Sequence, residues 1–462
     1  MNSNGADKMG TMPVGRLLIS MSLPMMISML IQALYNVVDS IFVAKLSEDA
    51  LTAVSMAFSM QTLIVASAGG IGVGLNALLS RALGEKKQEL ANKSAVNGLF
   101  LGLIAYVIFA IIGIIFVKPF YVFQTNDAAS PITKYGIEYL SCIMVCSVGM
   151  YAQMLLERLL ISTGRTLYSM ITQTTGAIIN IILDPILIFG LLGMPKMGVL
   201  GAAVATVIGQ CAAAVLALVF NITKNKDISL SIRKFRPDGR VIATILSVGI
   251  PSMIMQAIGS VMTFVFNKLL IWFSSTAVAV FGIYFKINSI IFMPIFGLNN
   301  GMVPIVAYNL GAKNRRRMTS TIKLSIIYAV SLMLIGLALI EIFPKQILML
   351  FSASENMLRI GIPALRIICL SFIFAGCSIV LSSVFQAMGY GVYSMIVSLI
   401  RQMFVLIPSA FILALIGKSM GNDVSYIWWS FNMAEIASIT TSLIIFMRLY
   451  KNTISKIPSG AQ

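Results

Sequence analysis

The chain has 462 residues, of which 58% are hydrophobic and only 11% are charged. A soluble domain carries about 25% charged residues, so this chain has too little polar material to cover itself in water, and the composition indicates a polytopic membrane protein. The formal net charge is +17 and there is no histidine, which excludes His-ligated metals and Ser-His or Cys-His nucleophile systems.

Twelve apolar segments are long enough to cross a membrane, because a transmembrane helix needs about 20 mostly apolar residues. The first begins after a polar N-terminal stretch and carries Pro24, Tyr35 and Asp39, so we expect a retained span and not a cleaved signal peptide. The expected spans are residues 16–44, 51–80, 94–117, 135–161, 167–190, 198–222, 241–273, 277–308, 320–342, 360–386, 392–416 and 425–448.

Positive charge is concentrated in alternate loops. An even number of spans puts both termini on one side of the membrane, and most of the 33 Lys and Arg residues fall on that side. The positive-inside rule therefore predicts a multi-pass protein of the cell membrane with both termini in the cytoplasm. Topology accounts for the basic charge, so nucleic acid is not expected as a partner. We interpret the Arg315–Arg317 cluster as part of this topology signal, with a contact to anionic lipid as the alternative.

An internal repeat divides the chain. At a spacing of 227 residues Pro24 aligns with Pro251 and Gly84 with Gly311, and the spacing becomes 225 in the later spans. Six spans per repeat give both halves the same orientation, so their pseudo-twofold axis must follow the membrane normal. The predicted fold class is an all-α polytopic membrane protein with twelve transmembrane helices in two six-helix lobes, which indicates secondary transport by alternating access. The predicted organisation is a cytoplasmic N-terminal segment (1–15), an N-lobe (16–222), an inter-lobe loop (223–240), a C-lobe (241–450) and a cytoplasmic tail (451–462).

Two acidic residues lie inside the N-lobe spans, where charge is costly and points to function. Asp39, Asp184 and Thr206 each fall about 9–12 Å below the outer end of their span, and Asn180 lies one turn deeper on the face of Asp184. Their oxygen atoms suit a monovalent cation, or a proton if one carboxylate is neutral. The alternative is that these acids only pair with polar neighbours.

The repeat does not conserve this acidic group in the C-lobe. The counterparts of Asp39, Asn180 and Asp184 are Phe266, Val405 and Ser409, so any coupling ion is expected in the N-lobe. The C-lobe spans carry cations instead. Lys286 could line a cavity or form a structural pair, whereas structural pairing is favoured for Arg366 and Arg401, with Glu435 as a partner for one of them.

Prolines and polar residues complete the list of candidates. Proline removes a helical hydrogen bond, so we expect kinks at Pro24, Pro185 and Pro251. Candidates for lining a substrate cavity are Gln32, Tyr35, Asn36, Gln256 and Lys286.

Several motifs together resemble the MATE family, the multidrug and toxic compound extrusion transporters, and the bacterial MepA-like branch in particular. They are Ser22–Pro24, Val38–Val43, Leu51–Ser55, Arg81–Lys86, Asn180–Pro185, Gly201–Thr206 and Asn309–Ala312, and the resemblance covers about residues 16–450. It implies an antiporter, not an enzyme, that expels cationic lipophilic compounds in exchange for Na⁺ or H⁺, without a cofactor and as a monomer. The family cation site maps onto Asp39, Asn180, Asp184 and Thr206.

Two rival functions are weighed against this one. A lipid-linked oligosaccharide flippase of the same superfamily would use cations such as Lys286, Arg366 and Arg401 to hold anionic headgroups. An intramembrane enzyme or receptor is the rival of another class, and the lack of histidine and of metal-ligand spacing argues against the enzyme. Na⁺ and H⁺ coupling stay open, because both use buried carboxylates.

Overall fold

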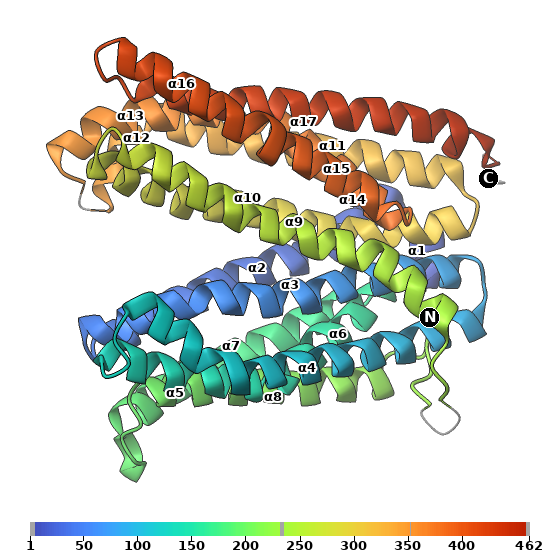
Figure 1. Ribbon diagram of the computed structural model, residues 1–462. Helices are drawn as coiled ribbons and strands as arrows, with labels where there is room; N and C mark the ends of the chain where they lie inside the picture. Colours follow the sequence, from blue (N-terminus) through green and yellow to red (C-terminus); the bar gives the residue numbers. More distant parts are fainter. Residues whose placement is uncertain (1–4, 232–234, 352, 459–462) are drawn as a thin grey trace.

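The computed structural model describes residues 5–231, 235–351 and 353–458, and nearly all of them lie in helices (Figure 1). Residues 1–4, 232–234 and 459–462, which belong to the predicted terminal and inter-lobe segments, lie outside the described residues. The helices of the first half are α1 (Asp7–Thr11), α2 (Val14–Ala44), α3 (Glu48–Gly84), α4 (Gln88–Thr125), α5 (Pro131–Val145), α6 (Val148–Ser162), α7 (Thr166–Phe189) and α8 (Val199–Thr223). Those of the second half are α9 (Gly239–Ile271), α10 (Ser275–Gly311), α11 (Arg315–Ile342), α12 (Pro344–Met349), α13 (Glu355–Cys369), α14 (Phe372–Ala387), α15 (Gly391–Leu399), α16 (Ile407–Ser419) and α17 (Ser425–Asn452).

The described helices account for the twelve predicted spans. Ten helical segments are long and apolar enough to cross a membrane by themselves, and α15 and α16 form one of these through a π-helical turn at Ile400–Leu406. The other two spans are the bent pairs α5–α6 and α13–α14. The all-α, twelve-span fold class is thereby confirmed.

Two of the predicted spans, 135–161 and 360–386, are each broken into two helices by a bend. α5 and α6 meet at 45°, and α13 and α14 meet at 49°. At each break a serine hydroxyl donates to the carbonyl three residues earlier, from Ser147 to Met144 (2.8 Å) and from Ser371 to Ile368 (2.7 Å). Such bonds compete with the backbone hydrogen bonds of a helix, and they accompany both breaks. No proline lies at either break.

The three prolines predicted to kink their spans lie inside helices that are assigned without interruption. Pro24 is in α2, Pro185 in α7 and Pro251 in α9. In each case the missing N–H removes one bond of the helical ladder without ending the helix. Their role in bending therefore stays a prediction.

The helices form two groups that meet near the end of the bundle where both termini lie, at the right of Figure 1. We call this the terminal end. The first group is α2–α8 and the second is α9–α17, and the main contacts between them join α2 with α10 and α3 with α9. Toward the opposite end the two groups diverge (Figure 1).

Repeat-related glycines allow this close approach between the groups. A Cβ on Gly84 would overlap the carbonyl of Tyr308, and a Cβ on Gly311 would overlap the carbonyl of Arg81. At a spacing of 227 residues Gly84 corresponds to Gly311 and Arg81 to Tyr308, so the two contacts are images of one another. The contact surface thus follows the pseudo-twofold symmetry predicted from the repeat.

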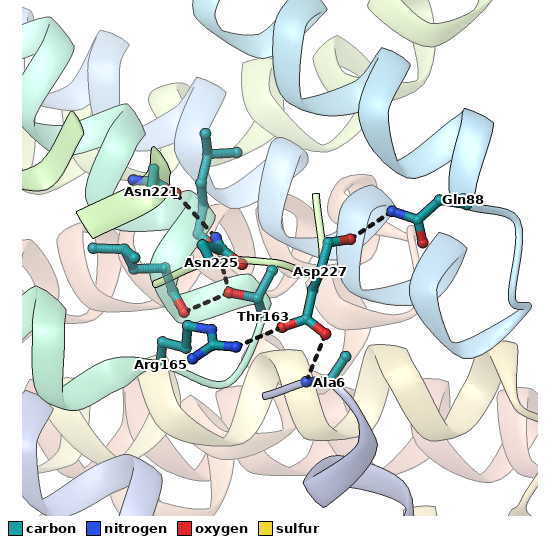
Figure 2. A network of polar contacts seen from close by, with 9 residues as sticks. Ala6, Gln88, Thr163, Arg165, Asn221, Asn225 and Asp227 are labelled. Carbon is teal, nitrogen blue, oxygen red and sulfur yellow. Dashed lines mark hydrogen bonds and ion pairs between the residues drawn. The ribbon is translucent and has the colours of Figure 1, made fainter. Parts of the chain in front are cut away.

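The N-terminal segment and the inter-lobe loop are tied together at the terminal end (Figure 2). Asp227 accepts from the backbone N–H of Ala6 (3.4 Å) and pairs with Arg165 (3.2 Å), while its carbonyl accepts from Gln88 (2.6 Å). Asp227 therefore connects the segment before α1, the residue before α7 and the start of α4, and Figure 2 shows these bonds converging on it.

The predicted topology cluster also has a structural role. Arg317 donates to the carbonyls of Met9 (3.1 Å) and Met12 (2.6 Å), and Arg315 donates to the carbonyl of Ser455 (2.8 Å). This cluster of the second group therefore holds both the N-terminal segment and the C-terminal end of the described chain.

Candidate functional site

Three helices of the first group bring the predicted acidic group together. α7 carries Asn180 and Asp184 one turn apart, α8 carries Thr206, and α2 carries Asp39. α7 packs against both α2 and α8, so it forms the middle of the site. Asp184 is fully buried and Asn180 and Thr206 nearly so, whereas Asp39 is half-buried.

Asn180 connects the two helices of the buried half of the site. In the amide orientation that satisfies all partners, its Nδ2 donates to Asp184 Oδ2 (3.3 Å). Its Oδ1 accepts from the hydroxyl (3.2 Å) and the backbone N–H (3.1 Å) of Thr206. The short spacing of Asn180 and Asp184 on one face follows from the helical repeat.

Asp39 and Asp184 face one another at hydrogen-bonding distance across α2 and α7. Asp39 Oδ1 is buried and has no hydrogen-bond partner. Tyr35 and Tyr139 lie near both carboxylates, and the hydroxyl of Tyr139 accepts from Gln61 Nε2 (3.1 Å). Two carboxylates this close cannot both stay charged at low cost, so the geometry favours a proton or a cation between them.

The donor set fits a small monovalent cation or a proton. Two carboxylates, an amide oxygen and a hydroxyl supply only oxygen ligands, and the unpartnered Asp39 Oδ1 is available to a ligand or a proton. Within the described residues no group of three His, Cys, Asp or Glu side chains could hold a metal ion.

The other predicted cavity residues lie on both lobes and are not brought to the acidic group, apart from Tyr35. Gln32 and Asn36 are exposed on α2. Gln256 of α9 lies against Gly69 of α3, where the two groups approach each other. Lys286 is exposed on α10, and its Nζ lies 5.8 Å above the ring centre of Phe351.

The intramembrane arginines have acidic partners, as predicted. Arg401 pairs with Glu435 at 2.8 Å, which confirms that Glu435 is a partner for one of them. Arg366 pairs with Glu341 at 3.4 Å, a partner that the sequence did not suggest. Both arginines are thus neutralised by neighbours within the second group.

One buried acid was missed at the sequence level. Glu157 of α6 is 3% exposed and accepts hydrogen bonds from Thr172 and Gln173 of α7. The signal was present, because this glutamate lies inside the expected span 135–161, where any charge suggests function. Unlike Asp39 and Asp184, Glu157 has no second acid at a similar depth in a neighbouring expected span, so the sequence did not suggest an acidic pair there.

These features define a class of protein: a two-lobed, twelve-span membrane transporter with a buried acidic group in one lobe. The MatE family model matches residues 24–186 and 251–412, once in each half of the chain. The matched segments begin at Pro24 and Pro251, which are aligned by the internal repeat. The chain belongs to the MatE family, whose members are transporters and not enzymes.

Curated relatives and solved structures resemble the chain over nearly its whole length. It is 27% identical over 437 residues to the multidrug export protein MepA of Staphylococcus haemolyticus (strain JCSC1435), covering 94% of each chain. It is 26% identical over 444 residues to MepA of Staphylococcus aureus (strain MSSA476), again covering 94% of each.

Two solved structures superpose with a TM-score of 0.90 at 26% identity, covering 99% of this chain and 100% of theirs. One is described as the outward-facing conformation of a multidrug resistance MATE family transporter of the MOP superfamily. The other is described as a MOP superfamily transporter from Pyrococcus furiosus Vc1 (DSM3638) whose reversed binding-pocket polarity suggests a different function. The family match and these likenesses agree with the resemblance inferred from the motifs.

Proposed function

We propose that the protein is a secondary active multidrug efflux antiporter that exports cationic lipophilic compounds in exchange for Na⁺ or H⁺. The observation that carries the proposal is the pair of the half-buried Asp39 and the fully buried Asp184, which has no counterpart in the repeat. The names of the MepA relatives support multidrug export as the direction of transport.

The exchange follows from competition for negative charge. When a cationic compound binds between the lobes, its positive charge weakens the binding of the coupling ion at Asp39 and Asp184. The coupling ion then leaves. When an ion rebinds from outside, it favours release of the compound. Inward movement of one positive charge supplies about 2.3 kcal/mol per 100 mV.

The contact pattern of the lobes supports an outward-facing state. The lobes touch at the terminal end, which the positive-inside rule assigns to the cytoplasm. The substrate route is then open toward the outside, as in the structure described as outward-facing. We place the protein in a bacterial cell membrane, as a monomer, with both termini in the cytoplasm.

The flippase alternative loses support from the pairing of the arginines. Arg366 and Arg401 are each bound to an acid, whereas Lys286 forms no ion pair with any residue that the structure describes. A headgroup site needs charge that is available to the ligand.

Dye efflux from proteoliposomes tests the proposal. Ethidium efflux is measured with a Na⁺ gradient and a pH gradient imposed separately, for the wild type and for Asp39→Asn and Asp184→Asn. We expect the wild type to respond to one of the two gradients and both variants to lose that response. Glu48→Gln, an exposed acid at the start of α3, is the matched control. Gradient-driven efflux that survives in both aspartate variants would contradict the proposal.

A further inference from the structure

Glu157 is a second buried carboxylate that the Asp39–Asp184 pair does not use. It lies in α6, five residues before this helix ends at Ser162, and faces the first turns of α7. Its partner Thr172 lies twelve residues before Asp184 on α7, a distance of about 18 Å along the helix. Glu157 therefore occupies the terminal half of the N-lobe, whereas Asp184 occupies the opposite half.

Neutral donors surround the Glu157 carboxylate. Oε1 accepts from Thr172 Oγ1 (2.9 Å) and Gln153 Nε2 (3.1 Å), and Oε2 accepts from Gln173 Nε2 (2.9 Å). In the described part of the chain, none of the ion pairs within 4.0 Å includes Glu157. A buried carboxylate without a partner cation is costly, so the surroundings favour uptake of a positive charge.

The one charged neighbour of Glu157 among the described residues points toward the other lobe. The guanidinium of Arg158 donates to Asn300 Oδ1 of α10 at 2.8 Å, and its side chain lies against Gly72 of α3. Arg158 therefore bridges the lobes in the region that must separate when the terminal end opens. Once the lobes part, the Arg158 charge loses Asn300 and becomes available to compensate Glu157.

The site also contains an acceptor for an added proton. Gln173 Oε1 is buried and has no partner, while its Nε2 donates to Glu157. Rotation of this amide by half a turn would place Oε1 against the carboxyl group, where it can accept from a protonated Glu157. The other nearest groups are N–H and O–H donors, which stabilise the carboxylate after the proton has left and do not form an oxygen cage for Na⁺.

We propose that Glu157 is a second proton-binding group, which holds a proton while Arg158 bonds Asn300 and releases it when this contact opens. In the release step the Glu157 O–H bond breaks and the proton passes to water entering from the terminal end. The inference rests on the proposed antiport and assigns to it an inner proton site, distinct from Asp39 and Asp184.

Infrared difference spectroscopy of the purified protein tests this site directly. Spectra between acidic and alkaline pH report the carboxylic acid C=O stretch of buried groups. We expect a band that disappears in Glu157→Gln and persists in Asp39→Asn, Asp184→Asn and the control Glu48→Gln. A spectrum unchanged by Glu157→Gln would overturn the inference.

Asn300→Ala provides a variant that keeps the glutamate. It frees Arg158, so we expect Glu157 to lose its proton at a lower pH than in the wild type. Thr319→Ala, which removes a hydroxyl that bonds only within α11, is the control and should leave the titration unchanged. If Glu157 loses its proton at the same pH in Asn300→Ala as in the wild type, the link to the lobe contact is overturned.

The outcomes separate this inference from the proposed antiport. A missing Glu157 band with normal ethidium efflux would refute the inner proton site alone. A Glu157 band that is present in a protein without any gradient-driven efflux would refute the antiport alone.

Discussion

The two lobes share one backbone plan but fill equivalent places with opposite chemistry. In the N-lobe, Asp39 faces Asp184 in a polar group that Asn180 and Thr206 complete. In the C-lobe, the counterpart of Asp39 is Phe266, which is fully buried and stacks with Phe281 at a ring-centre distance of 4.9 Å. At these equivalent places one lobe therefore carries titratable carboxyl groups, and the other carries aromatic rings that have no charge to change.

The aromatic group of the C-lobe is formed by Phe266, Phe281 and Phe431, and two of its rings occupy positions that correspond in the repeat to residues of the acidic site. Phe266 also contacts Phe431 at 5.0 Å, and Phe431 stands 225 residues after Thr206, at the equivalent place in the repeat. Aromatic pairs of this kind add packing energy and stiffness to a core. In terms of the proposed antiport, the C-lobe is the rigid lobe, and the N-lobe is the lobe whose acidic group would exchange the ion.

The largest expected effect comes from placing an acid in the aromatic group. Phe266→Asp buries a carboxylate without a partner and removes a large ring, at a cost of about 4 kcal/mol or more. We expect little folded protein, measured by thermal unfolding in detergent and by the aggregated fraction on size exclusion. Phe266→Leu is the control and should cost about 1 kcal/mol. A stable, well-folded Phe266→Asp protein would show that the C-lobe tolerates charge, and the contrast between the lobes would fail.

The next largest effect concerns the Arg401–Glu435 pair, in which Glu435 is the one buried acid of the C-lobe among the described residues. Their side chains are 30% and 11% exposed, so we expect Glu435→Gln to destabilise the protein by about 1–3 kcal/mol while gradient-driven efflux continues. The double variant Arg401→Met with Glu435→Gln should recover part of this loss, since no buried charge is left unpaired. Thermal midpoints and ethidium efflux are measured together. Loss of gradient response without loss of stability would make Glu435 a coupling acid and would end the asymmetry.

The sequence predicted the fold and most of the acidic site, because both depend on patterns that a single chain displays. Span length, loop charge and the 227-residue spacing specify twelve helices in two halves. The similar depth of Asp39, Asp184 and Thr206, with Asn180 one turn deeper on the face of Asp184, predicted a group of side chains that the structure does bring together.

Other features depend on contacts that sequence spacing does not reveal. The bends at Ser147 and Ser371 coincide with side-chain bonds to the backbone, and such bonds also occur in unbroken helices, so a serine in the sequence does not signal a bend. The Glu341 partner of Arg366 and the Asn300 partner of Arg158 come from other helices, whose faces are known only after packing. Glu157 was visible as a charge in a span, but its neutral donors were not.

The smallest effect has the opposite sign and tests whether the acidic site costs stability. Asp184→Asn removes one of two facing carboxylates and keeps an acceptor for Asn180, so we expect a gain of about 1 kcal/mol in the free energy of unfolding. Thr206→Val, which removes a bond to Asn180 without changing charge, should lose about 1 kcal/mol. Both are measured as thermal midpoints in detergent near neutral pH, and the Asp184→Asn gain should vanish at low pH, where the wild-type carboxyl groups bind protons. If Asp184→Asn were less stable than the wild type at neutral pH, the Asp184 carboxylate would stabilise the fold, as the rings around Phe266 do in the C-lobe. The facing carboxylates of the N-lobe would then carry no cost in stability, and this contrast between the lobes would fail.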